Sequence, residues 1–511
     1  MFKIEYLIAI VLYMAAVVLI GVLCSKKANK SSDDYFLGGR TLGPWVSAMS
    51  AEASDMSGWL LMGLPGLAYW CGLADAAWTA IGLAAGTYLN WLIVSKRLRR
   101  YSERVGAITI PDYFSNRFHE KKPILMVISS VLIIVFFTPY AGSCLMACGK
   151  LFSQLFGVSY ELMVVVAALF VLAYTFLGGF LGESISDFMQ AIVMVVALVL
   201  VLGLGIFNAG GIGAVIENSK NIPGFWSLLT SANPTGEVVN GAPVFGDPSN
   251  IAFITIASGL AWGLGYFGMP QVLLRFMAIR DEKELKLSRR VAQIWVMISL
   301  FAAIALGVVG RALYPVEYLD NASAENIFIL MSTNLLPALL AGLVCAGILA
   351  ASISSSDSYL LISASALTVN IYKGIIRKKA SDKEVMWVTR AILVCITLFA
   401  MLVATSGNQV IFTIVDFAWA GLGATFGPLM LFTLFWKKTT YPAAVAGMIT
   451  GGVTVIIWNF FIAPLGGIFA IYELLPAFIL SSIVIVVVSK LTGTPSQEIL
   501  DDYDAVVTKK A

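Results

Sequence analysis

The chain has 511 residues, of which 59% are hydrophobic and only 12% are charged, and its mean hydropathy is +0.87. Soluble domains carry about 25% charged residues, whereas here apolar runs long enough to cross about 30 Å of hydrocarbon as helices recur along the whole chain. The composition therefore excludes a soluble enzyme, a DNA-binding protein and a secreted disulfide-stabilised domain, and the formal net charge of +3 indicates no acidic partner.

Hydropathy predicts an all-α integral membrane protein with about thirteen transmembrane helices. The first apolar run is too long for the core of a signal peptide and lacks a small-x-small cleavage pattern, so we expect it to be retained as a helix. The predicted spans cover residues 5–23, 45–70, 74–95, 123–149, 158–178, 184–207, 251–274, 291–310, 335–372, 391–406, 409–436, 441–463 and 470–489.

Lysine and arginine are concentrated in alternate connections between these spans. The connections 24–44, 96–122, 275–290, 373–390 and 437–438, together with the tail from residue 490, hold 29 of the 33 basic residues. Basic residues favour the cytoplasmic side of a membrane. We therefore expect a multi-pass protein of the plasma membrane, with its N-terminus outside and its C-terminus in the cytoplasm. The loop 208–250 would then be extracellular, as short helices or as a lid.

The second predicted span carries polar residues where the membrane interior disfavours them. Helix-weakening residues follow at Gly63, Pro65 and Gly66. Such a pattern predicts a discontinuous helix, whose free carbonyls can bind a cation; the alternative is a polar packing face with a structural aspartate. The polar stretch contains Glu52, Ser54, Asp55, Ser57 and Gly58.

The seventh span contains a second interruption. Gly263, Gly265 and Gly268 formally match a dinucleotide-binding motif, but they lie inside an apolar span and are followed by Pro270. No βαβ unit surrounds them, so we interpret them as a broken helix that lines a cavity. The two breaks lie five spans apart and therefore run in opposite directions across the membrane, which is typical of two five-helix inverted repeats with a binding site at their interface.

This pattern divides the chain into five parts. The first inverted repeat is predicted over residues 45–207 and the second over 251–436, joined by the extracellular loop 208–250. The first helix and a cytoplasmic linker occupy 1–44, and two extra helices with a short cytoplasmic tail occupy 437–511.

Further polar residues lie in other spans. The ninth span holds a cluster of five serines and Asp357 between residues 350 and 358, and hydroxyl oxygens suit a hard cation such as Na⁺. Single serines often bond only to their own helix. Glu183 and Asp187 lie one turn apart at the inner start of the sixth span, where they could be functional or simply solvated. Asp416 lies deep in the eleventh span, and the sequence suggests no partner for it.

The chain has one histidine, His119, and six cysteines without a C-x-x-C pair. A single histidine cannot build a typical zinc site or a Ser-His-Asp triad. We therefore expect no catalytic residues and no enzyme, and a membrane-bound enzyme is a weak alternative.

At these residues the chain resembles the sodium/solute symporter family, and most closely its proline-transporting members. The resemblance covers almost the whole chain and implies the inverted-repeat transporter fold with broken second and seventh helices. The matching segments are 34–40, 53–66, 174–190, 262–278 and 350–355.

The resemblance also implies the roles of individual residues. A sodium ion would bind to three carbonyls and two hydroxyls, and two acids would support its coupling and inward path. This chain has Ser355 where the relatives usually have threonine, and its Asp357 and Asp416 have no counterpart in the family pattern. The implied sodium ligands are Ala53, Met56, Ala351, Ser354 and Ser355; the acids are Asp55 and Asp187; and the implied substrate positions are Ser57, Gly58, Tyr140, Trp262, Tyr266 and Pro270.

The resulting functional prediction is a secondary symporter that imports a small amino acid, expected to be L-proline, together with Na⁺ by alternating access. Its partners would be this solute, sodium and the lipid bilayer, with no nucleic acid. A potential of ~100 mV and a tenfold Na⁺ gradient together supply about 3.7 kcal/mol, enough for a roughly few-hundred-fold accumulation. The alternatives are a sodium symporter for pantothenate, a sugar or sialic acid, a channel, and a transport-like sensor.

Overall fold

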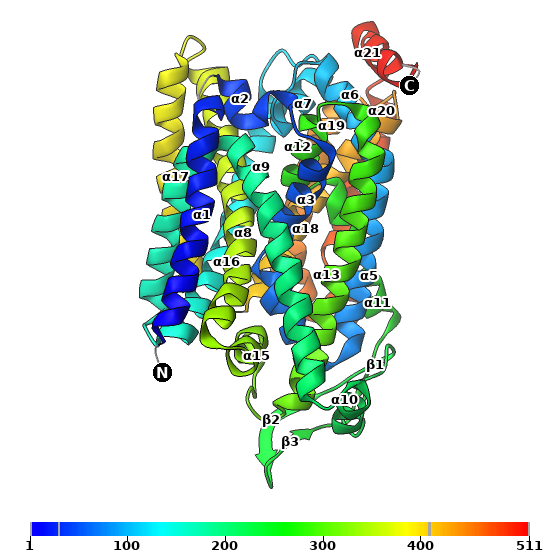
Figure 1. The fold of residues 1–511 in the computed structure, drawn as a ribbon. Helices are drawn as coiled ribbons and strands as arrows, with labels where there is room; N and C mark the ends of the chain where they lie inside the picture. The colour runs from blue at the N-terminus through cyan, green and yellow to red at the C-terminus, as the bar shows by residue number, and fades with distance from the viewer. Residues whose placement is uncertain (1–2, 29–30, 407–409, 509–511) are drawn as a thin grey trace.

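The computed structural model describes residues 3–28, 31–406 and 410–508, and its elements form one elongated helical bundle (Figure 1). The long helices are, in chain order, α1 (Ile4–Ala28), α3 (Pro44–Asp55) continued by η2 (Trp59–Gly63) and α4 (Leu64–Cys71), α5 (Leu73–Leu89) continued by η3 (Asn90–Val94) and α6 (Ser95–Arg104), α8 (Ile124–Phe156), α9 (Tyr160–Asn208), α11 (Phe253–Ala261) continued by η4 (Trp262–Phe267) and α12 (Pro270–Ala278), α13 (Leu285–Leu313), α16 (Ala338–Ser365) continued by η6 (Ala366–Ile376), α17 (Asp382–Thr405), α18 (Ile411–Phe435), α19 (Tyr441–Ile457) continued by η7 (Trp458–Ile462), and α20 (Leu474–Leu491).

Short elements cap the two ends of the bundle (Figure 1). One end of the bundle carries α2, α6, α7 and α21. The opposite end carries α10, α15, the β-strands and the start of α1. The short elements are α2 (Ser32–Leu37), η1 (Gly38–Arg40), α7 (Ile110–Arg117), α10 (Ile212–Ser219), β1 (Thr230–Ser231), β2 (Pro234–Val239), β3 (Ala242–Phe245), β4 (Ser249–Asn250), η5 (Glu282–Glu284), α14 (Asn321–Ala324), α15 (Ile327–Leu335), η8 (Ala463–Leu465), η9 (Gly467–Ala470) and α21 (Gln497–Thr508).

Within the described residues, nine helical segments are long and apolar enough to cross a membrane. Four shorter apolar helices lie at the first, second, fifth and seventh predicted spans: Ile4–Ile20, Trp59–Cys71, Tyr160–Phe176 and Phe253–Phe267. Each predicted span therefore coincides with a helix, but the number of thirteen crossings remains a prediction. The fifth and sixth spans follow one another directly in α9, where Gly179 has φ 52° and turns the chain sharply between them.

Both predicted helix interruptions are present. α3 ends at Asp55, and the next residue, Met56, has the non-helical angles φ −86° and ψ 80°. The seventh span changes from the α-helix α11 to the tighter 3₁₀ helix η4, and Met269 then adopts an extended conformation before α12 begins at Pro270. Proline is well suited to the first turn of a helix because its missing N–H would have no partner there.

The glycines of the seventh span serve helix packing. A Cβ atom on Gly263 would overlap the backbone of α5 at Gly82, and one on Gly265 would overlap the indole of Trp419 in α18. A side chain at Gly268 would meet the carbonyl of Leu422 at 2.6 Å. The G-x-G-x-x-G pattern therefore lets a broken helix pack tightly between α5 and α18, which is consistent with rejecting a dinucleotide site.

The loop 208–250 forms the short helix α10 and a β-hairpin. Strands β2 and β3 pair antiparallel, with Val239 opposite Ala242, and β1 pairs with β4. Asn240 and Gly241 connect β2 to β3 with φ values of 54° and 76°. Two consecutive positive φ angles at Asn-Gly are typical of a type I′ hairpin turn. Of the two predicted forms, short helices or a lid, the described loop contains one short helix, α10.

Candidate ion and solute site

The break in the second span brings the predicted sodium ligands of α3 and α16 together. Because α3 ends at Asp55, its last carbonyls lack the amides of a following turn. The carbonyl of Ala53 instead accepts hydrogen bonds from the hydroxyls of Ser354 at 2.6 Å and Ser355 at 3.2 Å. Ser354 also lies 3.3 Å from the carbonyl of Ala351.

All four of these residues are buried, so their oxygens converge in a dry region between two helices. A hydroxyl that donates to a carbonyl can rotate its hydrogen away and present a lone pair to a cation. The oxygen set thus fits a sodium ion held by carbonyls and hydroxyls. Met56, the remaining predicted ligand, directly follows the end of α3 and has its sulfur 3.9 Å from the hydroxyl of Ser299.

Asp55 is completely buried on the last turn of α3. Its carboxylate accepts a hydrogen bond from the amide of Gln271 in α12 at 3.2 Å, which links the two broken helices directly. Its carbonyl accepts bonds from the indole of Trp59 at 3.3 Å and the hydroxyl of Tyr140 at 3.4 Å. The predicted coupling acid is therefore placed where α3, α8 and α12 meet.

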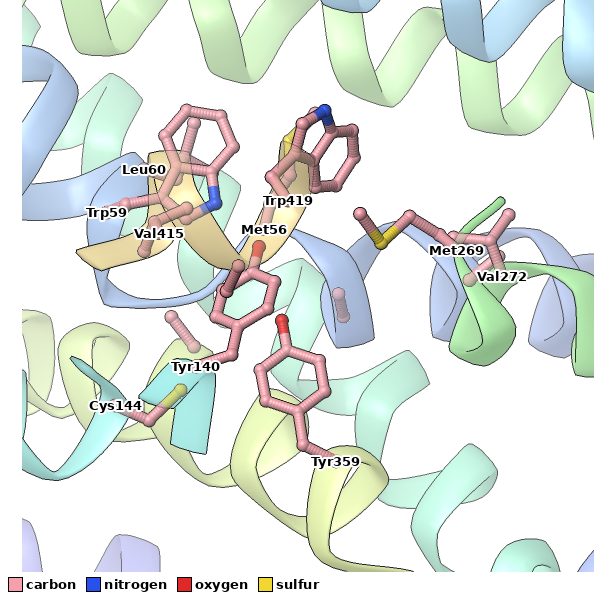
Figure 2. Close-up of a cluster of buried hydrophobic side chains, with 14 of the residues drawn as sticks. Met56, Trp59, Leu60, Tyr140, Cys144, Met269, Val272, Tyr359, Val415 and Trp419 are labelled. Atoms are coloured by element: carbon pink, nitrogen blue, oxygen red, sulfur yellow. The ribbon is translucent and has the colours of Figure 1, made fainter. Parts of the chain in front are cut away.

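Aromatic side chains surround this junction. Figure 2 shows Tyr140 of α8 and Tyr359 of α16 side by side, with their hydroxyls pointing the same way, toward the region of Met56 and Trp419. The centroids of the two tyrosine rings are 4.2 Å apart. Such a cluster can enclose a small apolar ring.

The predicted aromatic residues of the seventh span border the same cluster. Trp262 stacks on Trp419 at 6.1 Å and on Tyr472 at 5.3 Å, and Tyr266 meets Trp419 edge-on at 5.0 Å. Trp262 and Tyr266 are four residues apart in a 3₁₀ helix, in which residues four apart do not lie on one face as they would in an α-helix. The two rings instead contact Trp419 from different directions.

Ser57, Gly58 and Pro270, the other predicted substrate positions, are all buried at the two breaks. The Ser57 hydroxyl has no hydrogen-bond partner among the described residues. A Cβ atom on Gly58 would overlap the Cβ of Ala147 and lie 3.2 Å from the Ser352 hydroxyl. Gly58 is therefore required for close contact between the break, α8 and α16.

Glu183 and Asp187 are buried, so the alternative that they are solvated at the interface is wrong. Both form ion pairs with Arg275 of α12, whose nitrogen lies 3.0 Å from Asp187. Ser50 of α3 joins this network, since its hydroxyl donates to Asp187 at 2.7 Å and accepts from Arg275 at 2.9 Å. The network ties both broken helices, through α3 and α12, to α9.

Arg275 itself was assigned by sequence to the cytoplasmic connection 275–290, and this assignment is wrong. The residue lies inside α12 and its side chain is fully buried. The signal that could have identified it is the continuous apolar pattern up to Ala278, which extends the seventh span past the arginine. A buried arginine is costly unless it is paired, which here points to the acids of the sixth span.

The two acids without a family counterpart lie in different places. Asp357 is buried in α16, next to Ser358, which donates a hydrogen bond to Glu183. Asp416 borders a cavity of about 330 Å³ together with Trp262, Tyr472 and Glu473, and its carbonyl accepts a bond from the Tyr472 hydroxyl at 2.8 Å.

The sequence also left a buried ion pair unrecognised. Lys150 of α8 lies 2.6 Å from Glu325, and both side chains are buried. Glu325 further accepts bonds from the first amides of α18, at Ile411 and Phe412. A carboxylate at a helix N-terminus is stabilised by the helix dipole. The pair thus fixes the start of α18, the helix that supplies Trp419.

Comparison with known proteins identifies the family. The profile of the Sodium:solute symporter family matches residues 35–451. The chain belongs to this family. Sodium/proline symporters from several strains of Staphylococcus aureus, among them USA300 and NCTC 8325, are 40% identical to it over 506 residues, covering 98% of this chain and 95% of the relative. This result confirms the predicted family and its membrane-transporter character.

Solved structures show the same fold. A Na⁺-coupled sialic acid symporter in a substrate-bound outward-open state matches with a TM-score of 0.78 at 20% identity, covering 97% of this chain and all of that one. A nucleobase-cation-symport-1 family transporter in a closed conformation matches with a TM-score of 0.52 at 12% identity, covering 92% and 98%. At these identities the likeness concerns the fold alone. It confirms the predicted all-α membrane transporter fold.

Proposed function

We propose that this symporter family member imports L-proline together with Na⁺ across the plasma membrane. The observation that carries the proposal is the junction of the two broken helices, where buried oxygens from α3 and α16 converge beside a cluster of aromatic rings. The 40% identity to sodium/proline symporters over nearly the whole chain favours proline over other solutes. The sialic acid symporter with the same fold supports a different solute only at 20% identity.

An uptake screen tests the solute. Cells or vesicles carrying the protein would be given labelled proline, pantothenate, glucose and sialic acid, each with and without Na⁺. We expect uptake of proline alone, and only with Na⁺. Uptake of another solute without competition by proline would contradict the assignment and leave the sodium proposal standing.

In this proposal Ala53, Met56 and Ala351 provide carbonyls for the sodium ion and Ser354 and Ser355 provide hydroxyls. The ion would hold α3 and α16 together, because its ligands come from both. The solute would lie on the other side of the break. Its carboxylate would meet free amides near Ser57 and Gly58, and its ring would pack among Tyr140, Trp262, Tyr266 and Pro270. Asp187 would lie on the inward path of the ion.

Alanine at Ser354 or Ser355 is expected to raise the Na⁺ concentration for half-maximal uptake by roughly 10- to 100-fold. Loss of one ion–oxygen contact in a buried site is comparable to loss of a charge-assisted hydrogen bond, about 1.5–3 kcal/mol. Ser356→Ala is the matched control, because that hydroxyl bonds only to carbonyls of its own helix. Unchanged Na⁺ dependence in both variants would place the ion elsewhere.

Trp262→Ala is expected to raise the half-saturation concentration of proline by roughly tenfold or more, a loss of about 1.4 kcal/mol. The indole contacts the aromatic cluster rather than the sodium ligands, so the Na⁺ dependence should change much less. Trp387→Ala, on the exposed face of α17, serves as control. An equal loss of Na⁺ and proline affinity would indicate a general structural role for Trp262.

We further propose that the end of the bundle with the β-hairpin faces the outside of the cell. The basic connections support this orientation, because they gather near α2, α6 and α7 at the other end. In a variant whose native cysteines are serine, a cysteine at the exposed hairpin position Glu237 should react with an impermeant thiol reagent applied to intact cells. A cysteine at the exposed position Lys379 should not react, and reversed labelling would contradict the orientation.

A further inference from the structure

Glu52 and Asp55 form a pair of carboxylates on the last turn of α3. They are three residues apart, so their side chains leave the helix on the same side. Both residues are completely buried. The family resemblance assigns Asp55 to sodium coupling, whereas no role is assigned to Glu52.

No cationic side chain balances this pair among the described residues. One oxygen of Glu52 accepts a bond from the neutral indole of Trp91 at 3.0 Å, and one oxygen of Asp55 accepts a bond from the neutral amide of Gln271. The second oxygen of each carboxylate is buried without a hydrogen-bond partner in the described structure. Three of the other buried acids differ, since Glu183 and Asp187 share Arg275 and Glu325 has Lys150. Asp357 and Glu473 are also buried, and no ion pair of either is seen in the described residues.

Neutral oxygen atoms complete the surroundings of the pair. Tyr266 lies close to both Thr87 and Asp55. Asn90 is held nearby because its amide donates to the Tyr266 carbonyl at 2.8 Å. Four further oxygens thus lie buried with no hydrogen-bond partner in the described residues: Tyr266 Oη, Thr87 Oγ1, Asn90 Oδ1 and Gln271 Oε1.

Two buried negative charges without a counter-charge are strongly unfavourable. They must therefore be neutralised, either by protons or by a cation from outside. A hard monovalent cation prefers oxygen ligands, and the group offers carboxylate, amide, phenol and hydroxyl oxygens but no sulfur or imidazole.

We propose that Glu52 and Asp55, with the oxygens around them, form a second Na⁺ site. It lies on the side of α3 that faces α5, η4 and α12, whereas Ala53 points to Ser354 and Ser355 of α16. One ion would then link α3 to α16, and the second ion would link α3 to α5, η4 and α12. The inference rests on the proposed sodium symport and adds that two sodium ions bind for each solute.

Binding of ²²Na⁺ to the purified full-length protein in detergent, without proline, tests the stoichiometry. We expect about two ions per protein for the wild type and about one for Glu52→Gln. Glutamine keeps the size of the side chain and an oxygen for Trp91, but removes the charge. At a Na⁺ concentration that just saturates the wild type, Ser355→Ala should also bind about one ion, and the double variant close to none. Glu161→Gln, at an exposed position, should bind as the wild type does.

A wild-type value of one ion, or an unchanged value of two in Glu52→Gln, would overturn the second site. A second result would also overturn the site: the wild type binds one ion and loses uptake as the pH rises, and Glu52→Gln does not show this loss. That result would assign a proton, rather than a sodium ion, to the pair. The wild-type value decides the question even where Glu52→Gln does not fold. Na⁺-dependent proline uptake is measured separately, so failure of that proposal is distinguishable.

Discussion

Asp55→Asn is expected to abolish Na⁺-driven proline uptake almost completely while the protein still reaches the membrane. Asparagine keeps the shape of the side chain and an oxygen that can accept from Gln271, but it removes the charge. Loss of a charge-assisted contact in a buried site costs about 1.5–3 kcal/mol. This loss would weaken sodium binding by roughly 10- to 100-fold.

Uptake of labelled proline over a range of Na⁺ concentrations measures this effect, with surface expression determined in parallel. Asp55→Glu should retain more activity, because it keeps the carboxylate and moves it by one methylene. Robust sodium-coupled transport by the asparagine variant would reduce Asp55 to a structural residue.

Arg275→Met is expected to destabilise the protein by about 3–5 kcal/mol, because it leaves Glu183 and Asp187 buried without their cation. The measurement is the denaturation midpoint of the detergent-solubilised protein. Arg275→Lys should be intermediate, since a lysine keeps the charge but cannot reproduce the forked contacts of the guanidinium with Ser50 and both acids.

The variant Arg280→Met is the control for this experiment, because Arg280 forms only an exposed ion pair with Glu284. Adding Glu183→Gln to Arg275→Met should restore part of the lost stability by removing one of the two uncompensated charges. A midpoint for Arg275→Met equal to that of the control would show that the network does not stabilise the folded protein.

The sequence predicted those features that break the rules of a membrane helix. Glycine, proline and acids inside an apolar span indicate a discontinuous helix, and both breaks lie where this pattern appears, at Met56 and Met269. The contacts between Ala53 and the serines of α16 were expected only through family resemblance. No local pattern reports that residues about 300 positions apart lie within 3.2 Å.

The missed features share one cause, which is long-range pairing of charges. Arg275 looks like the first residue of a basic loop until Glu183 and Asp187 are known to lie beside it. Lys150 likewise gave no signal, because its partner Glu325 lies 175 residues away, between α14 and α15. Composition alone cannot distinguish a buried, neutralised charge from a solvated one. The sequence also did not predict the 3₁₀ form of η4, since glycine-rich segments are compatible with several backbone conformations.

Counterflow and gradient-driven uptake in proteoliposomes test the central claim, sodium-coupled solute import, most directly. The purified protein would be reconstituted into sealed vesicles, and labelled proline would be followed after an inward Na⁺ gradient is imposed. We predict accumulation above the external concentration, which collapses when the Na⁺ gradient is dissipated, and exchange of labelled for unlabelled proline. Equal uptake with and without the gradient, or flux without exchange, would indicate a channel or facilitator and contradict the account.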